Sequence, residues 1–291
     1  MIAEIFGVTA PVFLMAFAGY VWARARQPFD LDFVTRLSLS FSVPCLIFAT
    51  LVKAEITSGA VAEIAVATLV GYGLAGVVLA GALALLRLDQ RIWLAPAVFG
   101  NTGNVGLPVA FFAYGPEGLA LAVVVFAVMA VLSFTIGIWL VAGAGQPGQV
   151  LRQPLVYASL AGGAAAITGW APPDWAIDTL ALAGQIAIPL MLLTLGVSIA
   201  RLAVSGLGTA TGLAVLKLAA TVGAGWAAAT AFGLEGPAFG ALILQLAMPA
   251  AVTSYLLAAR YERDPEAVAG LVVVSTFMSL AFIPALLSVL L

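Results

Sequence analysis

The sequence predicts an all-α integral membrane protein with ten transmembrane helices arranged as two inverted five-helix repeats. Three observations predict it. The 291-residue chain is 64% hydrophobic and only 8% charged, whereas soluble domains carry about 25% charged residues. Apolar stretches of about 20 residues, each able to cross a hydrocarbon core about 30 Å thick as a helix, recur from end to end. Segments of the first half also reappear in the second.

The spans are separated by charged residues or by glycine and proline, which interrupt the hydropathy. We expect the first apolar run to be a retained helix and not a signal peptide, because Glu4 precedes it and Arg24 and Arg26 follow it. The ten predicted spans are 5–23, 33–52, 61–86, 93–113, 117–142, 153–170, 177–200, 206–230, 237–259 and 267–290.

The inventory of reactive residues argues against several functions. Cys45 is the single cysteine and there is no histidine, which leaves no intramolecular disulfide, no histidine metal site and no Cys/His nucleophile pair. We therefore expect no metal and no cofactor. A net charge of −2 gives no reason to expect a nucleic-acid partner. A membrane-embedded enzyme would need clustered carboxylates or a nucleophile with its base, and no predicted span carries such a cluster.

Basic residues predict the orientation, because positively charged loops stay in the cytoplasm. Eight arginines occupy the odd-numbered loops, and Lys53 is the one basic residue of the even-numbered loops. We expect a multi-pass protein of the inner (cell) membrane, with both termini outside the cytoplasm.

The two halves of the chain share short segments. The segment at 116–125, PEGLALAVVV, matches 265–274, PEAVAGLVVV, at six of ten positions, an offset of 149 residues. Pro44 and Pro189 stand in similar segments at an offset of 145. Chance is the alternative in so apolar a chain, but the offsets agree. We divide the chain into repeats at 1–145 and 146–291, joined by a short Gly/Pro stretch at 143–153. Five helices per repeat, an odd number, forces the second copy to insert upside down, as in many secondary transporters.

Spans four and nine both contain an interruption. The segment 100–108, GNTGNVGLP, holds three glycines and a proline, and the offset of 149 places it opposite 249–257, PAAVTSYLL. Such breaks are tolerated at membrane depth where protein or a water-filled cavity satisfies the backbone, and the resumed helix points a partial positive charge inward. Close packing of small residues is the alternative, but asparagine side chains would be penalised in lipid. The predicted substrate-binding residues at the two breaks are Asn101, Gly103, Asn104, Pro249, Thr253 and Ser254.

Two ionisable residues inside or near the spans have alternative interpretations. Lys217 lies midway along span eight, and we expect it to take part in transport by compensating an anionic substrate or by pairing with an acid. Lys217→Met should then reduce flux, unless the side chain only snorkels to the interface. Glu63 is either a proton-coupling site or an interfacial charge.

Three segments resemble the auxin efflux carrier family of bacterial and plant transporters: Gly100–Pro108, Ser42–Phe48 (SVPCLIF) and Ala247–Ala251 (AMPAA). The resemblance implies a bile acid:sodium symporter-like fold in which helices 4 and 9 cross near the midplane. It implies a scaffold of helices 1, 2, 6 and 7 that can form a homodimer, and a moving transport domain of helices 3–5 and 8–10. Asn101 is similar to the crossover asparagine that contacts the substrate carboxylate, Pro249 to the second crossover proline and Glu63 to an acidic coupling residue.

The sequence departs from the plant members in two places. Residues 121–131 are apolar throughout, and the midpoint loop is short. We therefore expect a secondary carrier for a small organic anion, a carboxylate that is auxin-like or malate- or malonate-like, moved by an elevator mechanism. A channel would favour rings of charge or a continuous polar stripe. Sodium coupling of the bile-acid type would favour a carboxylate at a helix break, and neither break has one.

Overall fold

The computed structural model describes residues 2–54, 58–143 and 153–291. These residues form helices and contain no β-strand, apart from one isolated bridge described below. Most of the predicted linker at 143–153 lies outside the described residues. The elements are α1 (Ile2–Arg24), α2 (Leu31–Leu37), η1 (Ser38–Ser42), α3 (Val43–Lys53), α4 (Ser58–Leu85), α5 (Gln90–Val98), η2 (Thr102–Gly106), α6 (Leu107–Leu132), η3 (Ser133–Gly137), α7 (Ile138–Ala142), α8 (Pro154–Thr168), α9 (Asp174–Gln185), α10 (Ala187–Arg201), α11 (Leu207–Ala231), α12 (Gly236–Ala247), α13 (Val252–Arg260) and α14 (Pro265–Leu290).

Seven helical segments of the described chain are long and apolar enough to cross a membrane. One of them is a run from Thr102 to Ala142, 41 residues, which would measure about 60 Å if straight, twice the thickness of the hydrocarbon core. Gly115 divides that run, with φ 65° and ψ −154°, a conformation essentially confined to glycine. The division falls between the predicted spans 93–113 and 117–142. The two shorter apolar helices are Pro154–Ala166 and Gly236–Ala247. That the chain crosses the membrane ten times remains a prediction.

Side-chain caps fix several helix starts near the connections. Asp30 accepts a hydrogen bond from the Phe33 backbone N–H (2.9 Å), and Asp89 accepts one from that of Arg91 (2.8 Å). Asp264 accepts one from the Ala267 N–H (3.2 Å). Each carboxylate satisfies a donor that has no partner within its helix. The acidic residues of these connections therefore begin helices α2, α5 and α14.

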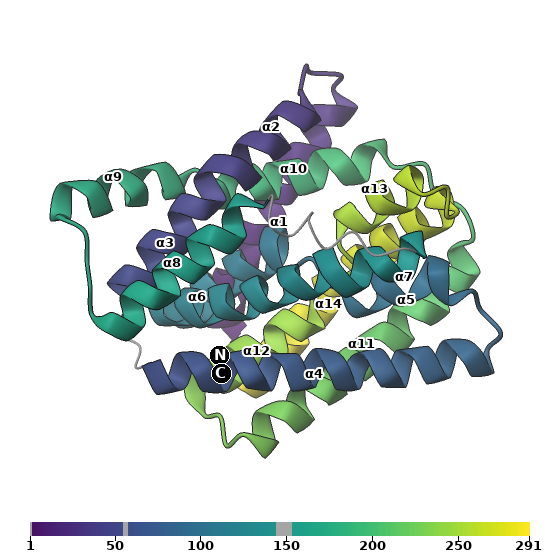
Figure 1. Ribbon diagram of the computed structural model, residues 1–291. Coiled ribbons are helices and arrows are strands. Elements are labelled where there is room, and N and C mark those ends of the chain that lie inside the picture. Colours follow the sequence, from purple (N-terminus) through teal and green to yellow (C-terminus); the bar gives the residue numbers. More distant parts are fainter. Residues whose placement is uncertain (1, 55–57, 144–152) are drawn as a thin grey trace.

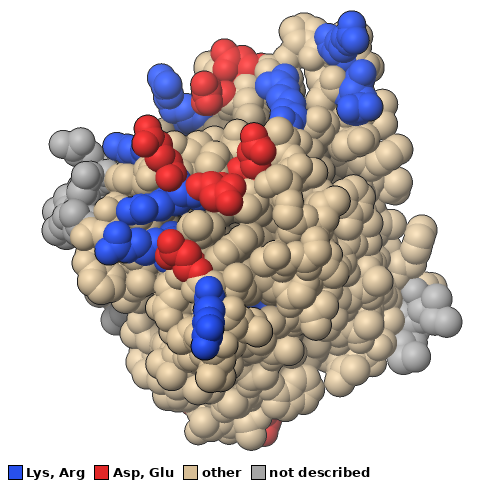
Figure 2. Space-filling model, turned by 90° about the vertical axis from the view of Figure 1, so that its right-hand side faces the viewer, with Lys and Arg blue, Asp and Glu red and all other residues tan. Residues whose placement is uncertain are grey.

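The helices pack in two groups that share an interface. Helix α1 packs extensively against α10, and α3 packs against α8 and α9. In the second group, α11 packs against α4, α12 and α14, and α6 packs against α4 and α12 (Figure 1). Charged side chains gather toward one end of the molecule, above a broad uncharged surface (Figure 2). An uncharged belt of this kind is the surface that lipid would cover.

Candidate functional site

The two predicted helix breaks meet in the structure. Between α5 and η2, and between α12 and α13, the chain is extended for a few residues, and Gly100 and Ala250 form an antiparallel bridge. The Asn101 backbone N–H donates to the Pro249 carbonyl over 2.6 Å. Gly100 permits this approach, because a Cβ at that position would lie 2.9 Å from the carbonyl oxygen of Met248. The crossing therefore satisfies backbone groups that lipid could not.

Local sequence explains why the chain is interrupted between α12 and α13. Met248 is extended (φ −60°, ψ 145°), as expected for a residue that precedes a proline. The Ala250 N–H donates to the Ser275 hydroxyl of α14 over 3.0 Å. Helix α13 resumes at Val252 without a side-chain cap. The Ser254 N–H donates to the Ala251 carbonyl over 3.0 Å, which leaves the Val252 and Thr253 N–H groups at the start of α13 available to a ligand.

Polar side chains at the crossing are buried, and several lack a protein partner. Asn101 is 5% exposed, and its Nδ2 atom has no hydrogen-bond partner among the described residues. The same holds for the Thr102 hydroxyl and for both amide atoms of Gln245. Buried polar groups are normally paired, and an unpaired one costs about 1–3 kcal/mol. These groups are therefore candidates for contact with a ligand or with water.

A cavity of about 400 Å³ reaches the residues that follow the two breaks, whereas Asn101 is buried beside it and is not among its lining residues. Asn104 from η2 and Thr253 from the first turn of α13 both line it, so the amino ends of both resumed helices reach the same space. Thr194 and Ser198 of α10 line the opposite wall. The cavity also includes three charged residues that sequence reasoning treated only as interfacial or topological signals: Asp32, Arg36 and Arg201.

The other predicted residues occupy different surroundings. Gly103 and Pro249 are buried at the crossing. Ser254 is buried beside a second cavity of about 260 Å³, which Thr253 also lines. Lys217 is buried behind the crossing and is not among the residues that line the 400 Å³ cavity. The structure thus brings Asn104 and Thr253 together at one cavity.

Glu63 lies away from the crossing. Its side chain is exposed on the sixth residue of α4. Tyr72 of the same helix packs against Phe99 of the first break, with ring centroids 6.0 Å apart. Glu63 precedes Tyr72 by nine residues, or about 14 Å along the helix. Among the described residues, no group of three or more His, Cys, Asp or Glu side chains is placed to hold a metal ion.

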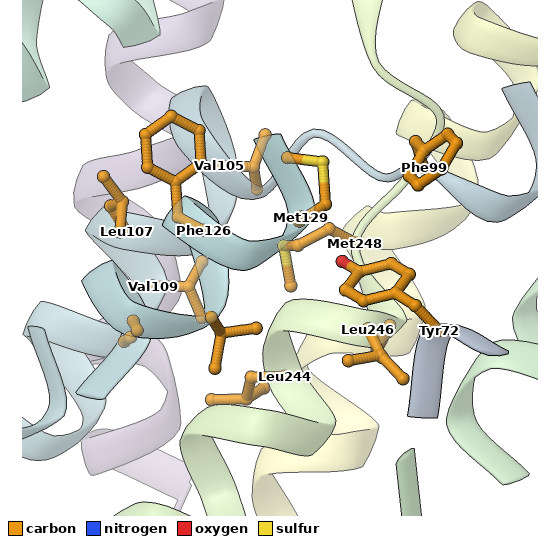
Figure 3. Close-up of a cluster of buried hydrophobic side chains, with 14 of the residues drawn as sticks. Tyr72, Phe99, Val105, Leu107, Val109, Phe126, Met129, Leu244, Leu246 and Met248 are labelled. Carbon is orange, nitrogen blue, oxygen red and sulfur yellow. The ribbon is translucent and has the colours of Figure 1, made fainter. Parts of the chain in front are cut away.

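A hydrophobic cluster surrounds the crossing on the side of α4, α6 and α12. Met129 and Met248 lie between Phe126 on one side and Tyr72 on the other (Figure 3). Leu246 and Phe99 pack in the same cluster and are almost fully buried. The extended backbone is therefore held within packed side chains, as non-helical backbone at membrane depth must be.

The chain is similar in sequence to known membrane transport proteins. A family model described as "Membrane transport protein" matches residues 4–156 and 149–287. An "uncharacterized transporter" of Methanothermobacter thermautotrophicus is 26% identical over 276 residues, which covers 88% of this chain and 87% of the relative. Another, from Methanocaldococcus jannaschii, is 26% identical over 201 residues and covers 64% of each chain.

Proposed function

Because the chain belongs to the membrane transport protein family, that of the auxin efflux carriers, we propose that it is a secondary active transporter for a small organic anion. One observation carries the proposal: Asn104 and Thr253, near the amino ends of two resumed helices from opposite halves of the chain, line one cavity. Family membership supports transport, and the chemistry of the cavity supports the class of substrate.

A carboxylate fits the groups that line the cavity. Helix amino ends carry a partial positive charge and free N–H donors, which favour an anion. Asparagine, threonine and serine side chains add neutral donors, and Arg36 and Arg201 in the same lining add positive charge that Asp32 partly offsets. A volume of about 400 Å³ is within the usual range of small-molecule sites, about 300–1,000 Å³. We propose that the carboxylate binds at the crossing, with Asn101 and Asn104 as amide donors and Thr253 across from them.

The direction in which the cavity opens follows from the predicted topology. Arg36 and Arg201 line its outer part, and arginine-rich connections mark the cytoplasmic side. Lys53 and Asp178, which we place on the opposite side, form an ion pair at 3.1 Å. With ten crossings and both termini outside the cytoplasm, the cavity opens toward the cytoplasm. This conformation is the one that would release or accept substrate in the cytoplasm.

An elevator movement is supported by how the helices pack. The group formed by α1–α3 and α8–α10 corresponds to the scaffold, and α4–α7 with α11–α14 corresponds to the transport domain. Two apolar cavities lie at the interface of these groups, of about 300 Å³ between α1, α10 and α14 and about 330 Å³ between α3, α8, α4 and α6. Phe17 and Phe277 in the first cavity and Leu160 in the second are more than half exposed, so both are open grooves along the line where the two groups meet. A second copy could pair through the scaffold helices.

Flux into proteoliposomes tests this function against the alternatives. A carrier gives saturable uptake of a labelled mono- or dicarboxylate and counterflow driven by unlabelled substrate inside, whereas a channel gives neither. Omitting sodium tests sodium coupling, and Glu63→Gln under an imposed pH gradient tests whether Glu63 couples proton movement. Non-saturable ion currents without counterflow would contradict the proposal.

A further inference from the structure

Lys217 is the one buried charged side chain among residues whose burial the structure describes, with 2% exposure. It lies near the middle of α11 (Leu207–Ala231). Its Nζ atom donates to the carbonyl oxygen of Ala97 over 3.2 Å. Ala97 is the penultimate residue of α5, so its carbonyl belongs to the last turn, where carbonyls have no helical partner. The lysine therefore satisfies the carboxyl end of the first half-helix and does not extend to the membrane interface.

The carboxyl end of the second half-helix lies beside the same lysine. A small cavity lined by Lys217 is also lined by Ala247, Met248 and Pro249, where α12 ends. Two hydroxyl residues of α14, Ser275 and Ser279, complete its polar lining. Lys217 thus stands where the carboxyl ends of both half-helices converge.

The carboxyl ends of α5 and α12 favour a positive charge beside them. Each carries a partial negative charge equivalent to about half an elementary charge, so two together approach one full charge at membrane depth. Helix α12 carries no acidic residue, and Arg91 is the one ionisable side chain of α5. The attraction for a cation therefore comes from the peptide groups, with no carboxylate required. The amino ends of the resumed helices, at Asn104 of η2 and Thr253 of α13, line the larger cavity instead.

We propose that Lys217 is a built-in countercation, whose ammonium group occupies the place where a free monovalent cation would otherwise neutralise the carboxyl ends of α5 and α12. The crossing is then assembled without a bound ion, and Lys217 positions the half-helices without contacting substrate. Tyr72 on α4 precedes Lys217 by 145 residues, the offset that also separates Pro44 and Pro189. The first half of the chain therefore has a phenol where the second half has the cation, so one lysine serves both breaks.

Thermal unfolding of the purified protein in detergent tests this inference without any substrate, so its outcome is independent of the transport proposal. The melting temperature is measured in chloride salts of choline, sodium, lithium and methylammonium at equal ionic strength. The parent protein should melt at the same temperature in all four. Lys217→Ala should melt about 2–5 °C lower in choline, and it should recover at least part of that loss in methylammonium or sodium, which fit the vacated space.

Thr221→Val is the matched control, because Thr221 is fully buried one turn along α11 and its hydroxyl donates to the Lys217 carbonyl. The Thr221→Val protein should differ from the parent in melting temperature by the same amount in all four salts. Lys217→Arg keeps the charge and should also show no preference among them. If Lys217→Ala does not fold, Lys217→Gln is measured in the same way. A Lys217→Ala or Lys217→Gln protein that melts like the parent, or whose loss of melting temperature is the same in every salt, would overturn the inference.

Discussion

Asn101 combines two roles at the crossing. Its backbone N–H joins the two breaks through the Pro249 carbonyl, whereas its side-chain amide is buried with an unpaired Nδ2. A backbone bond survives substitution, but the side-chain donor does not. The residue therefore allows ligand binding to be tested without cutting the hydrogen bond that holds the breaks together.

Asn101→Ala should raise the dissociation constant of the carboxylate roughly five- to hundredfold, because one hydrogen bond worth about 1–3 kcal/mol is lost. Equilibrium binding to purified protein is the appropriate measurement, since flux also depends on conformational steps. Asn104→Ala should weaken binding less if Asn104 mainly stabilises the break. Thr135→Val, which removes a hydroxyl bonded to its own helix at Val131, is the control and should bind normally. A folded Asn101→Ala protein with parental affinity would place the site elsewhere.

Sequence patterns identified part of the candidate site and missed the rest for a physical reason. The asparagines and Pro249 were recognisable because amides and helix breakers are rare at membrane depth. Thr194 and Ser198 carry no such signal, since hydroxyl residues are common in apolar helices and can bond to their own backbone. Arg36 and Arg201 resemble ordinary cytoplasmic arginines. Their position at the cavity depends on how α2 and α10 pack, which local sequence does not encode.

Among the helices, α1 and α10 approach closely through glycine. A Cβ on Gly196 would overlap the Ala16 carbonyl oxygen, and one on Gly19 would overlap that of Leu193. Small residues at such contacts let helix backbones pack tightly in membranes. Neither neighbour is a side chain that could rotate away.

Gly196→Ala should therefore force α1 and α10 apart and lower the melting temperature by several degrees, since overpacking typically costs about 1–3 kcal/mol. Gly212→Ala on α11 is the control, because a Cβ there meets no atom within 4 Å. It should leave the melting temperature unchanged or raise it slightly, as alanine favours helix over glycine. Equal effects of the two substitutions would show that backbone contact at α1 and α10 does not limit stability.

Helices were predicted more reliably than their interruptions. Each of the ten predicted ranges is mostly helical, because long apolar runs leave the backbone no other partner in lipid, and the ranges 93–113 and 237–259 also contain the two extended breaks. The interruption between α9 and α10, at Ile186, lies inside the predicted span 177–200. Gly184 and Pro189 flank Ile186, and Pro189 has no N–H to donate to the Gln185 carbonyl four residues earlier. The apolar run continues through both residues, so they marked no boundary between spans. Gly115, in contrast, is followed by Pro116, and that pair did mark a boundary.

For the whole molecule, the loop charges predict that both termini lie outside the cytoplasm. After Cys45→Ala, cysteines introduced at Ala3 and at Leu291 should react with a membrane-impermeant maleimide in intact cells. A cysteine at Leu86, next to the arginine-rich connection before α5, should react only after permeabilisation. Reversal of these patterns would invert the topology and turn the 400 Å³ cavity to the outside.

Relative movement of the two helix groups makes a second prediction at this scale. Phe17 of α1 and Phe277 of α14 line one cavity at the interface of the groups. In the Cys45→Ala background, cysteines at these two positions joined by a short bismaleimide should abolish flux, because the link ties the scaffold to the transport domain. Joining Phe17 to Ile199 of α10, which lines the same cavity, stays within the scaffold and should leave flux unchanged. Normal flux in the first linked pair would contradict an elevator movement.

The hydrogen bond from Asn101 to Pro249 also bears on how the chain is made. Ribosomes deliver the first break to the membrane well before residue 249 has been synthesised, so for that interval the extended residues after α5 lack their backbone partners. A nascent first half must shelter those groups with water, the translocon or an insertion factor. We expect a chain that stops after the first five helices to be removed by membrane proteases, and co-expression of the missing half to protect it. We therefore expect membrane proteases to degrade chains in which the two breaks have not yet paired and to spare chains in which they have.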